Sequence, residues 1–227
     1  MTGRPAPHPS RSRRARATRT RILEAARQEL GRNPDTGLGA IAEAAGVARR
    51  TVYAHFAGRA ALVEGLAADA AEAIRLAVPF ARTPAADPAT ELARFVLTLW
   101  PVGDRYRVLI RLARQDPGAG RADELLAPAR DSATRILTLG QRQGVFHSAL
   151  PPGPLSRTLE AQLLALLDGV NAGIWADDGT SAATAALIAA GVDSEVATST
   201  VHRVRSTGPT SPTKGRTPPP PREERGR

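Results

Sequence analysis

Apolar residues recur at helical spacing along most of this chain, and the repeats are interrupted at proline and glycine. Runs of β-branched residues, which would favour strands, are absent from the sequence, whereas Ala and Leu are abundant. The pattern therefore predicts an all-α protein of about nine helices. The expected helices cover approximately residues 17–30, 38–45, 49–55, 58–76, 88–100, 104–115, 122–143, 156–176 and 181–190. Asp87 is the expected N-cap of the helix at 88–100, and residues 151–154 are expected to form a loop.

The stretch from residue 36 to residue 59 predicts two short helices joined by a tight turn at Gly46. Apolar residues at Leu38 and Ile41, and again at Val52 and Phe56, give each helix one buried face. The other face of the second helix carries hydrogen-bond donors and no acidic residue, and a helix-turn-helix places such a face in the DNA major groove. These donors are Arg49, Arg50, Thr51, Tyr53 and His55, with Arg59 just beyond.

This region resembles the DNA-binding domain of tetracycline-repressor-like (TetR-type) transcriptional regulators over about residues 19–66. The matching elements are Ile22-Leu23-Glu24-Ala25-Ala26, Thr36, Ile41-Ala42, Ala45-Gly46-Val47, Thr51-Val52-Tyr53-Ala54-His55-Phe56 and Arg59-Ala60-Ala61-Leu62. The resemblance implies an N-terminal three-helix domain, joined by a fourth helix to an α-helical ligand-binding and dimerisation domain.

The same resemblance assigns roles to the donors. Thr51, Tyr53 and His55 would contact DNA phosphates, and Thr36 and Arg59 would hold the same backbone; Thr36 could also cap the second helix with its hydroxyl. The alternative for Tyr53 and His55 is packing within the small domain. Arg49 and Arg50 would enter the groove, where a guanidinium either reads a guanine or neutralises a phosphate. Glycines at 37 and 39 and the Pro34-Asp35 pair depart from the family pattern.

The net charge of +9 lies in the two ends of the chain. Residues 1–21 hold seven Arg and no acid, and residues 203–227 carry +5, so the remaining 181 residues carry −3. We therefore expect a disordered basic arm at residues 1–15, which could contact phosphate or the minor groove, and a solvated Pro/Arg-rich tail at residues 199–227. The DNA-binding domain would occupy residues 16–66, and the regulatory and dimerisation domain residues 67–198.

Composition excludes several other classes of protein. The chain has no Cys, which removes disulfides, zinc fingers and thiol catalysis. It has no uninterrupted apolar run long enough for a membrane span and no secretory signal, so a cytoplasmic location is expected. The sequence also lacks a zinc-protease motif, a phosphate-binding loop and a serine nucleophile turn. We expect no enzyme activity, no metal and no cofactor.

The second domain offers a few polar and aromatic candidates for a ligand pocket: Trp100, Tyr106, His147, Asp168, Asn171 and Trp175. The alternative is that Asp168 lies at a helix crossing or at the solvent edge, and that the two Trp belong to the core. The helix expected at 156–176 is apolar on more than one side, so a second subunit should cover part of it. The dimer residues expected from this argument are Leu159, Leu163, Leu167 and Leu187.

Together with these features, the resemblance to TetR-type regulators implies a repressor that binds a palindromic operator in double-stranded DNA as a homodimer and is released by a small molecule of unknown identity. The alternative is an architectural protein that binds DNA without sequence preference and has no effector. That alternative would not need a large helix that is apolar on two faces.

Overall fold

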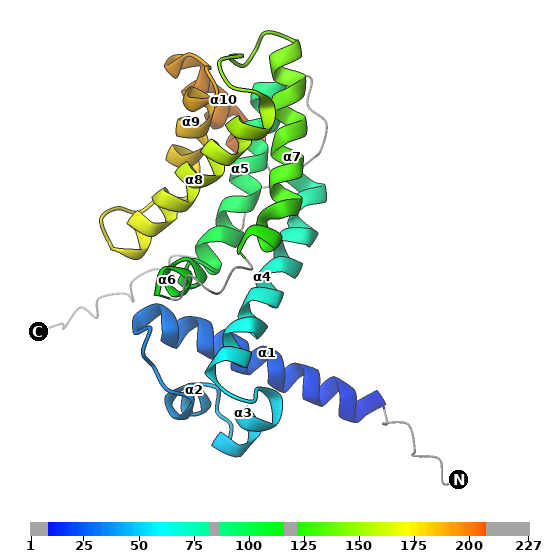
Figure 1. Ribbon diagram of the computed structural model, residues 1–227, viewed down its shortest axis with the longest axis vertical. Coiled ribbons are helices and arrows are strands. Elements are labelled where there is room, and N and C mark those ends of the chain that lie inside the picture. Colours follow the sequence, from blue (N-terminus) through cyan, green and yellow to red (C-terminus); the bar gives the residue numbers. More distant parts are fainter. Residues whose placement is uncertain (1–8, 82–86, 116–121, 208–227) are drawn as a thin grey trace, which may run out of the picture.

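The computed structural model describes residues 9–81, 87–115 and 122–207. These residues form ten α-helices and no strand (Figure 1), which confirms the all-α prediction with one helix more than expected. The helices are α1 (Pro9–Arg32), α2 (Leu38–Ala44), α3 (Arg49–His55), α4 (Arg59–Ala81), α5 (Pro88–Arg105), α6 (Val108–Gln115), α7 (Ala122–Arg142), α8 (Pro152–Asn171), α9 (Thr180–Ala189) and α10 (Ser194–Thr207).

The helices form two bodies with separate apolar cores. Helices α1 to α3 gather at one end of the molecule, and α4 runs from them into a bundle of the remaining helices (Figure 1). The small body is built around Ile22, Leu30, Ile41 and Val52, none of which is exposed to solvent. Burial of one such side chain stabilises a fold by roughly 1.5–3 kcal/mol, so this short segment can hold a fixed shape.

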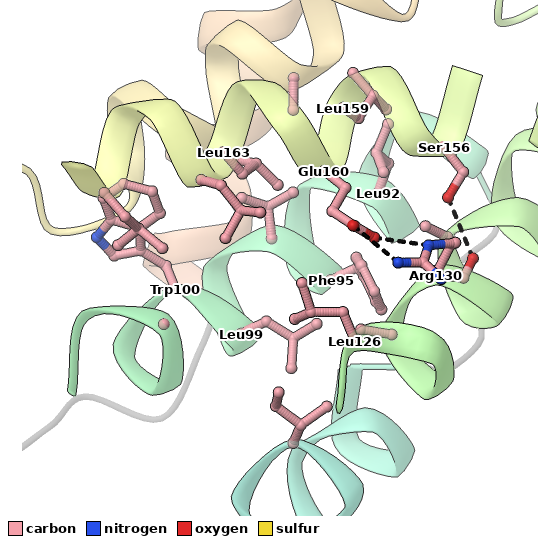
Figure 2. A pocket seen from close by; sticks show the side chains of 18 residues that line it. Leu92, Phe95, Leu99, Trp100, Leu126, Arg130, Ser156, Leu159, Glu160 and Leu163 are labelled. Atoms are coloured by element: carbon pink, nitrogen blue, oxygen red, sulfur yellow. Dashed lines mark hydrogen bonds and ion pairs between the residues drawn. The ribbon is translucent and has the colours of Figure 1, made fainter. Parts of the chain in front are cut away.

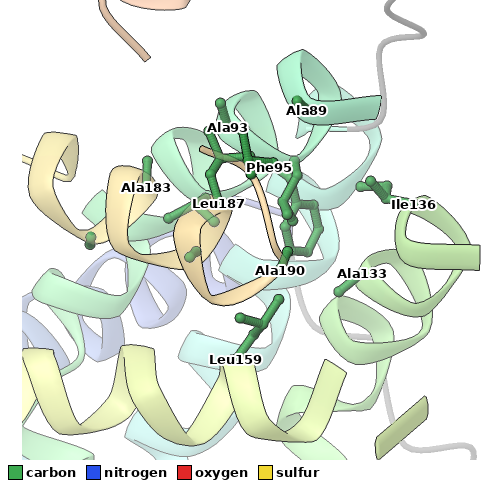
Figure 3. Close-up of a cluster of buried hydrophobic side chains, with 14 of the residues drawn as sticks. Ala89, Ala93, Phe95, Ala133, Ile136, Leu159, Ala183, Leu187 and Ala190 are labelled. Atoms are coloured by element: carbon green, nitrogen blue, oxygen red, sulfur yellow. The ribbon is translucent and has the colours of Figure 1, made fainter. Parts of the chain in front are cut away.

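In the bundle, the Ala-rich helix α9 lies directly against α5. Ala183 and Leu187 face Ala93 and Phe95, and Leu159 of α8 lies below them (Figure 3). Because alanine side chains are short, the backbones of α5 and α9 approach closely. In the described part of the chain, no helix is long and apolar enough to cross a membrane.

Both expected tails were given wrong boundaries. Helix α1 begins at Pro9, so residues 9–15 are helical, because proline at the first helical position loses no hydrogen bond and Ala and Arg favour helix. Helix α10 was not predicted and continues to Thr207. Asp193 accepts bonds from the backbone N–H of Glu195 and Val196 at its start, and Val201 is fully buried. The remaining expected tail residues, 1–8 and 208–227, lie outside the described residues.

Prolines explain the other differences in helix boundaries. The expected stops at Pro79 and Pro101 were wrong, since α4 and α5 continue through them. The lost hydrogen bond is offset by burial of neighbouring side chains such as Val78 and Trp100. The expected loop at 151–154 was wrong because α8 begins at Pro152, where proline fits the first turn. The predicted cap of α5 is confirmed: the Asp87 carboxylate accepts from the N–H of Thr90 at 2.9 Å.

Candidate DNA interface and ligand cavity

The turn between α2 and α3 fixes how α3 is presented. Gly46 has a φ of +62°, which a glycine adopts without strain, and the Val47 N–H then donates to the Ala42 carbonyl at 3.0 Å. Val52 and Phe56 anchor the inner side of α3 in the small core. The opposite side of α3 therefore faces outward, at the end of the molecule away from the bundle (Figure 1).

The outward side of α3 carries the predicted donors on one surface. Arg49 and Arg50 are exposed, Tyr53 is 46% exposed, and Thr51 and His55 are half-buried. The Arg49 guanidinium lies 5.8 Å from the centre of the Tyr53 ring. Two arginines at the N-terminus of a helix oppose its dipole, and a polyanion bound there would remove this unfavourable interaction.

Thr36 and Arg59 are brought together by direct contacts, but the predicted cap at Thr36 was wrong. The N-cap of α2 is Gly37, without a side-chain bond, and the Thr36 hydroxyl donates to the Asn33 carbonyl at 2.8 Å. The Arg59 guanidinium donates to the carbonyls of Thr36 and Pro34, the former at 2.8 Å. Arg59 thus holds the loop before α2 against the start of α4, and its expected phosphate contact stays a prediction.

The N-terminal half of α1 adds positive charge beyond α3. Arg13, Arg14 and Arg16 are exposed, and α1 projects past α3 on one side (Figure 1). Arg19 is also exposed, and its guanidinium lies 5.1 Å from the centre of the buried Phe56 ring, which it contacts within the small domain. The exposed arginines extend the basic surface of the small domain.

The bundle contains a partly open cavity of about 140 Å³ between α4, α5, α7, α8 and α9. Its walls are almost entirely apolar, as Figure 2 shows for Leu92, Phe95, Leu99 and Leu163. The charged side chains that line it are Arg130 and Glu160, which form a bidentate ion pair with distances of 2.8 Å (Nε to Oε2) and 2.9 Å (Nη2 to Oε1). The pair is largely buried, with side-chain exposures of 12% and 22%.

Of the six predicted pocket residues, only Trp100 lines this cavity. Four of the other five form hydrogen bonds with other parts of the chain, outside the cavity. The Tyr106 hydroxyl donates to Asp69, the Asn171 amide to the Arg107 carbonyl, and the Trp175 indole N–H to the Leu166 carbonyl. His147 Nε2 lies 3.1 Å from the Ala189 carbonyl, while its Nδ1 accepts from the Ala149 N–H. Asp168 is half-buried on α8 and is not among the lining residues.

The predicted dimer residues are also placed differently. Leu159, Leu163 and Leu167 line the cavity, and Leu187 is fully buried against α5. Three of these four leucines are covered within one chain, and the role of the four in a dimer contact stays a prediction. The side of α8 that carries Leu159 and Leu167 packs into the bundle, whereas Ala161 and Ala165 on its other side are exposed. The sequence analysis missed Arg130 and Glu160; a lone acid among inward-facing leucines of α8 was the available signal.

The end of α5 and the start of α6 connect the bundle to the DNA-binding domain. Arg27 of α1 donates to the Arg105 carbonyl at 3.1 Å, and Arg105 pairs with Glu24 at 3.4 Å. The hydrogen bonds from Arg27, more than any other cause, lower the pKa of Glu24. Val108 of α6 is buried in the core of the small domain. We call Glu24, Arg27, Arg105 and Tyr106, with Asp69, the junction contacts.

The cavity lies next to this junction along α5. Trp100 and Gly103 line the cavity, and a side chain at Gly103 would overlap the Leu167 side chain, which also lines it. Arg105 and Tyr106 follow within one helical turn. A change in the distance between α5 and α8 at Gly103 would therefore also shift the C-terminal end of α5, which carries Arg105 and Tyr106 of the junction contacts.

Within the described residues, no group of three or more His, Asp or Glu side chains could hold a metal ion.

Comparisons with known proteins agree with this geometry. Residues 22–66 match the family described as bacterial regulatory proteins, tetR family. No curated protein matches the chain. A TetR-family regulator, PfmR from Thermus thermophilus, is 18% identical, with a TM-score of 0.64 over 76% of this chain and 98% of its own. A putative TetR-family regulator from Rhodococcus sp. is 19% identical, with a TM-score of 0.62 over 76% of this chain and 96% of its own.

A third similar structure is that of RolR in complex with the ligand resorcinol. It is 25% identical, with a TM-score of 0.50 over 85% of this chain and 96% of its own. The first two likenesses show a shared fold, and the family match covers the helix-turn-helix whose donors are described above. Residues 22–66 therefore form the helix-turn-helix of the tetR family of bacterial regulatory proteins, and the chain as a whole has the fold of TetR-family transcriptional regulators.

Proposed function

We propose that this regulator is a repressor that binds a palindromic operator as a homodimer and is released when a small molecule enters the bundle cavity. The observation that carries the proposal is the partly open apolar cavity beside Gly103, one helical turn from the junction contacts. A regulator without an effector would gain stability by filling this space, because unfilled core volume is unfavourable. The operator places the protein with the DNA in the cytoplasm.

On the operator, Thr51, Tyr53 and His55 would contact phosphates, with Thr36 and Arg59 supporting the same backbone strand. Arg49 and Arg50, exposed at the start of α3, would reach base edges in the major groove. The exposed arginines of α1 would add phosphate contacts at the flank of each half-site.

For the dimer we propose a surface of small residues in place of the leucines. On α8 the side opposite the cavity exposes Ala161 and Ala165, the C-cap residue Ala172 is also exposed, and on the neighbouring α9 Ser181 and Ile188 are exposed, Ile188 by 45%. Small side chains let two helix pairs approach closely around a two-fold axis. We expect Ala165→Arg to give a monomer of about half the mass of the native species in light scattering, whereas Arg157→Ala, at the edge of this surface, should leave the dimer intact.

Ligand release would follow from the position of the cavity. A molecule that enters it must displace side chains of α5 and α8, which meet at Gly103 and Leu167. That displacement would alter the junction contacts and so the orientation of α3 in each subunit. The similar protein RolR was solved with resorcinol bound, which supports a small-molecule effector for this chain as well.

Selection from randomised DNA tests the proposal against the architectural alternative. We expect an inverted repeat whose half-sites lie about one helical turn apart, and binding that survives excess competitor DNA. Binding of every sequence with equal strength would refute the proposal and support the architectural alternative. In that case the cavity would have no regulatory role.

A further inference from the structure

The cavity in the bundle is polar at one end only. Arg130 of α7 and Glu160 of α8 lie together on one side of it, and Trp100 lies on the other (Figure 2). Ser156 is close to the pair, but its hydroxyl donates to the Arg130 carbonyl at 3.2 Å. The Trp100 indole N–H donates to the Asp177 carbonyl at 3.1 Å, so this aromatic side chain presents carbon to the cavity. A bound molecule would therefore meet polar atoms at a single point.

The size of the cavity limits the ligand. Its volume of about 140 Å³ is close to that of an apolar protein cavity, roughly 150 Å³, that holds one benzene molecule. A single ring with one or two small substituents fills this space. A fused-ring or long-chain molecule would extend beyond this volume through the open side of the cavity.

The charges of Arg130 and Glu160 favour an uncharged ligand over an anionic or a cationic one. Each Glu160 oxygen accepts one bond from Arg130 and keeps a second lone pair, so the carboxylate can accept a further hydrogen bond. A ligand carboxylate would lie beside the Glu160 charge in apolar surroundings, which is unfavourable. A cationic ligand would likewise meet Arg130. An uncharged hydroxyl group satisfies the site because it can donate to Glu160 without adding charge.

We propose that the cavity binds an uncharged molecule of single-ring size that carries a hydroxyl group, a phenol or a comparable alcohol, with the hydroxyl donating to the Glu160 carboxylate. This inference rests on the proposed function in one respect: the cavity that binds the ligand is the same cavity that we propose to regulate DNA binding.

The test uses three probes that share a methyl-substituted benzene ring and differ in the para substituent: 4-methylphenol, toluene and 4-methylbenzoate. Calorimetric titration of the full chain, together with the shift in melting temperature, should rank 4-methylphenol about tenfold tighter than toluene, because a hydrogen bond to a charged acceptor contributes at this scale. 4-Methylbenzoate should not bind measurably. Equal binding of 4-methylphenol and toluene, or preference for the benzoate, would overturn the proposal.

Two variants change the polar end in defined ways. Glu160→Gln removes the negative charge and keeps an acceptor oxygen, so the preference for 4-methylphenol over 4-methylbenzoate should fall by at least about tenfold. Glu72→Gln, in an exposed ion pair with Arg75 on α4, is the matched control and should leave the ranking unchanged. If Glu160→Gln does not fold, Arg130→Met combined with Glu160→Leu replaces the whole pair by apolar side chains. That variant should bind toluene more tightly than 4-methylphenol.

Operator release separates the ligand class from the proposed function. Tighter binding of 4-methylphenol without any loss of operator affinity supports the ligand class and contradicts release by ligand. Release by a charged or multi-ring molecule, with no binding of 4-methylphenol, supports release by ligand and overturns the ligand class.

Discussion

At the scale of single residues, Tyr106 shows how the junction depends on one protonation state. Its hydroxyl donates to Asp69 of α4 at 2.6 Å, and burial together with this bond raises the pKa of Tyr106 to about 12. The raised pKa means that the folded protein favours the neutral phenol. The stabilisation is fully present below pH 10, the ordinary tyrosine value, and is lost as the pH rises from 10 to 12.

We therefore expect the free energy of unfolding to fall between pH 10 and pH 12, and Tyr106→Phe to reduce that slope. The chain has two tyrosines, so Tyr53→Phe leaves Tyr106 as the sole tyrosine. In that variant, tyrosinate absorbance should appear near pH 12. Absorbance that appeared near pH 10 with the protein still folded would mean that the bond to Asp69 is absent in solution.

The DNA-facing residues allow a second prediction at this scale. Thr51→Ala and Tyr53→Phe should weaken binding to every DNA sequence by similar factors, because phosphate contacts carry no sequence information. Arg49→Ala or Arg50→Ala should instead relax the preference at one base pair of each half-site, by roughly 1–3 kcal/mol. Selection from randomised DNA with each variant measures both effects. An altered motif in the Thr51 or Tyr53 variants would reverse these role assignments.

At the scale of helices, we expect replacement of two glycines by alanine to have opposite effects on the free energy of unfolding. Gly39 lies in α2 with no atom near the position of an added Cβ, so Gly39→Ala should stabilise the fold by up to about 1 kcal/mol. Gly140 lies in α7, and a Cβ there would overlap the buried Phe146 ring, so Gly140→Ala should destabilise it by about 1–3 kcal/mol. Urea unfolding compares the two. Equal effects would mean that Phe146 moves aside at little cost.

Local sequence rules predicted helices better than they predicted the site. Capping by Asp87 and the apolar spacing of α1 to α3 depend on near neighbours, so those elements followed from sequence. Pro101 did not end α5, because burial across the bundle outweighed a local rule. The cavity joins residues from α4, α5, α7, α8 and α9, and no local pattern could show that Glu160 would meet Arg130 or that Leu163 would face a cavity. The placement of the α3 donors on one surface was predictable because these residues lie within one short segment.

At the scale of the whole molecule, regulation requires that ligand binding in the cavity and DNA binding by α3 are energetically coupled. The two bodies touch through α4, α6 and the junction contacts, and Arg27 bridges them by donating from α1 to the Arg105 carbonyl. Coupling between ligand and DNA is reciprocal: if the ligand weakens operator binding by some factor, the operator weakens ligand binding by the same factor. Ligand affinity measured with and without operator therefore gives the coupling directly.

Arg27→Ala should reduce this coupling by about 0.5–2 kcal/mol while leaving ligand affinity without DNA unchanged, because the arginine touches the α5 end but not the cavity. Arg32→Ala is the matched control: Arg32 also pairs with a glutamate on α1, Glu29, but its side chain is 72% exposed and the pair lies within α1. Titration of the regulator with 4-methylphenol, or with whichever effector releases the operator, measures each variant. An unchanged coupling in Arg27→Ala, or an equal loss in Arg32→Ala, would mean that the signal passes through the packing of α4 and α6 and not through the Arg27 bridge.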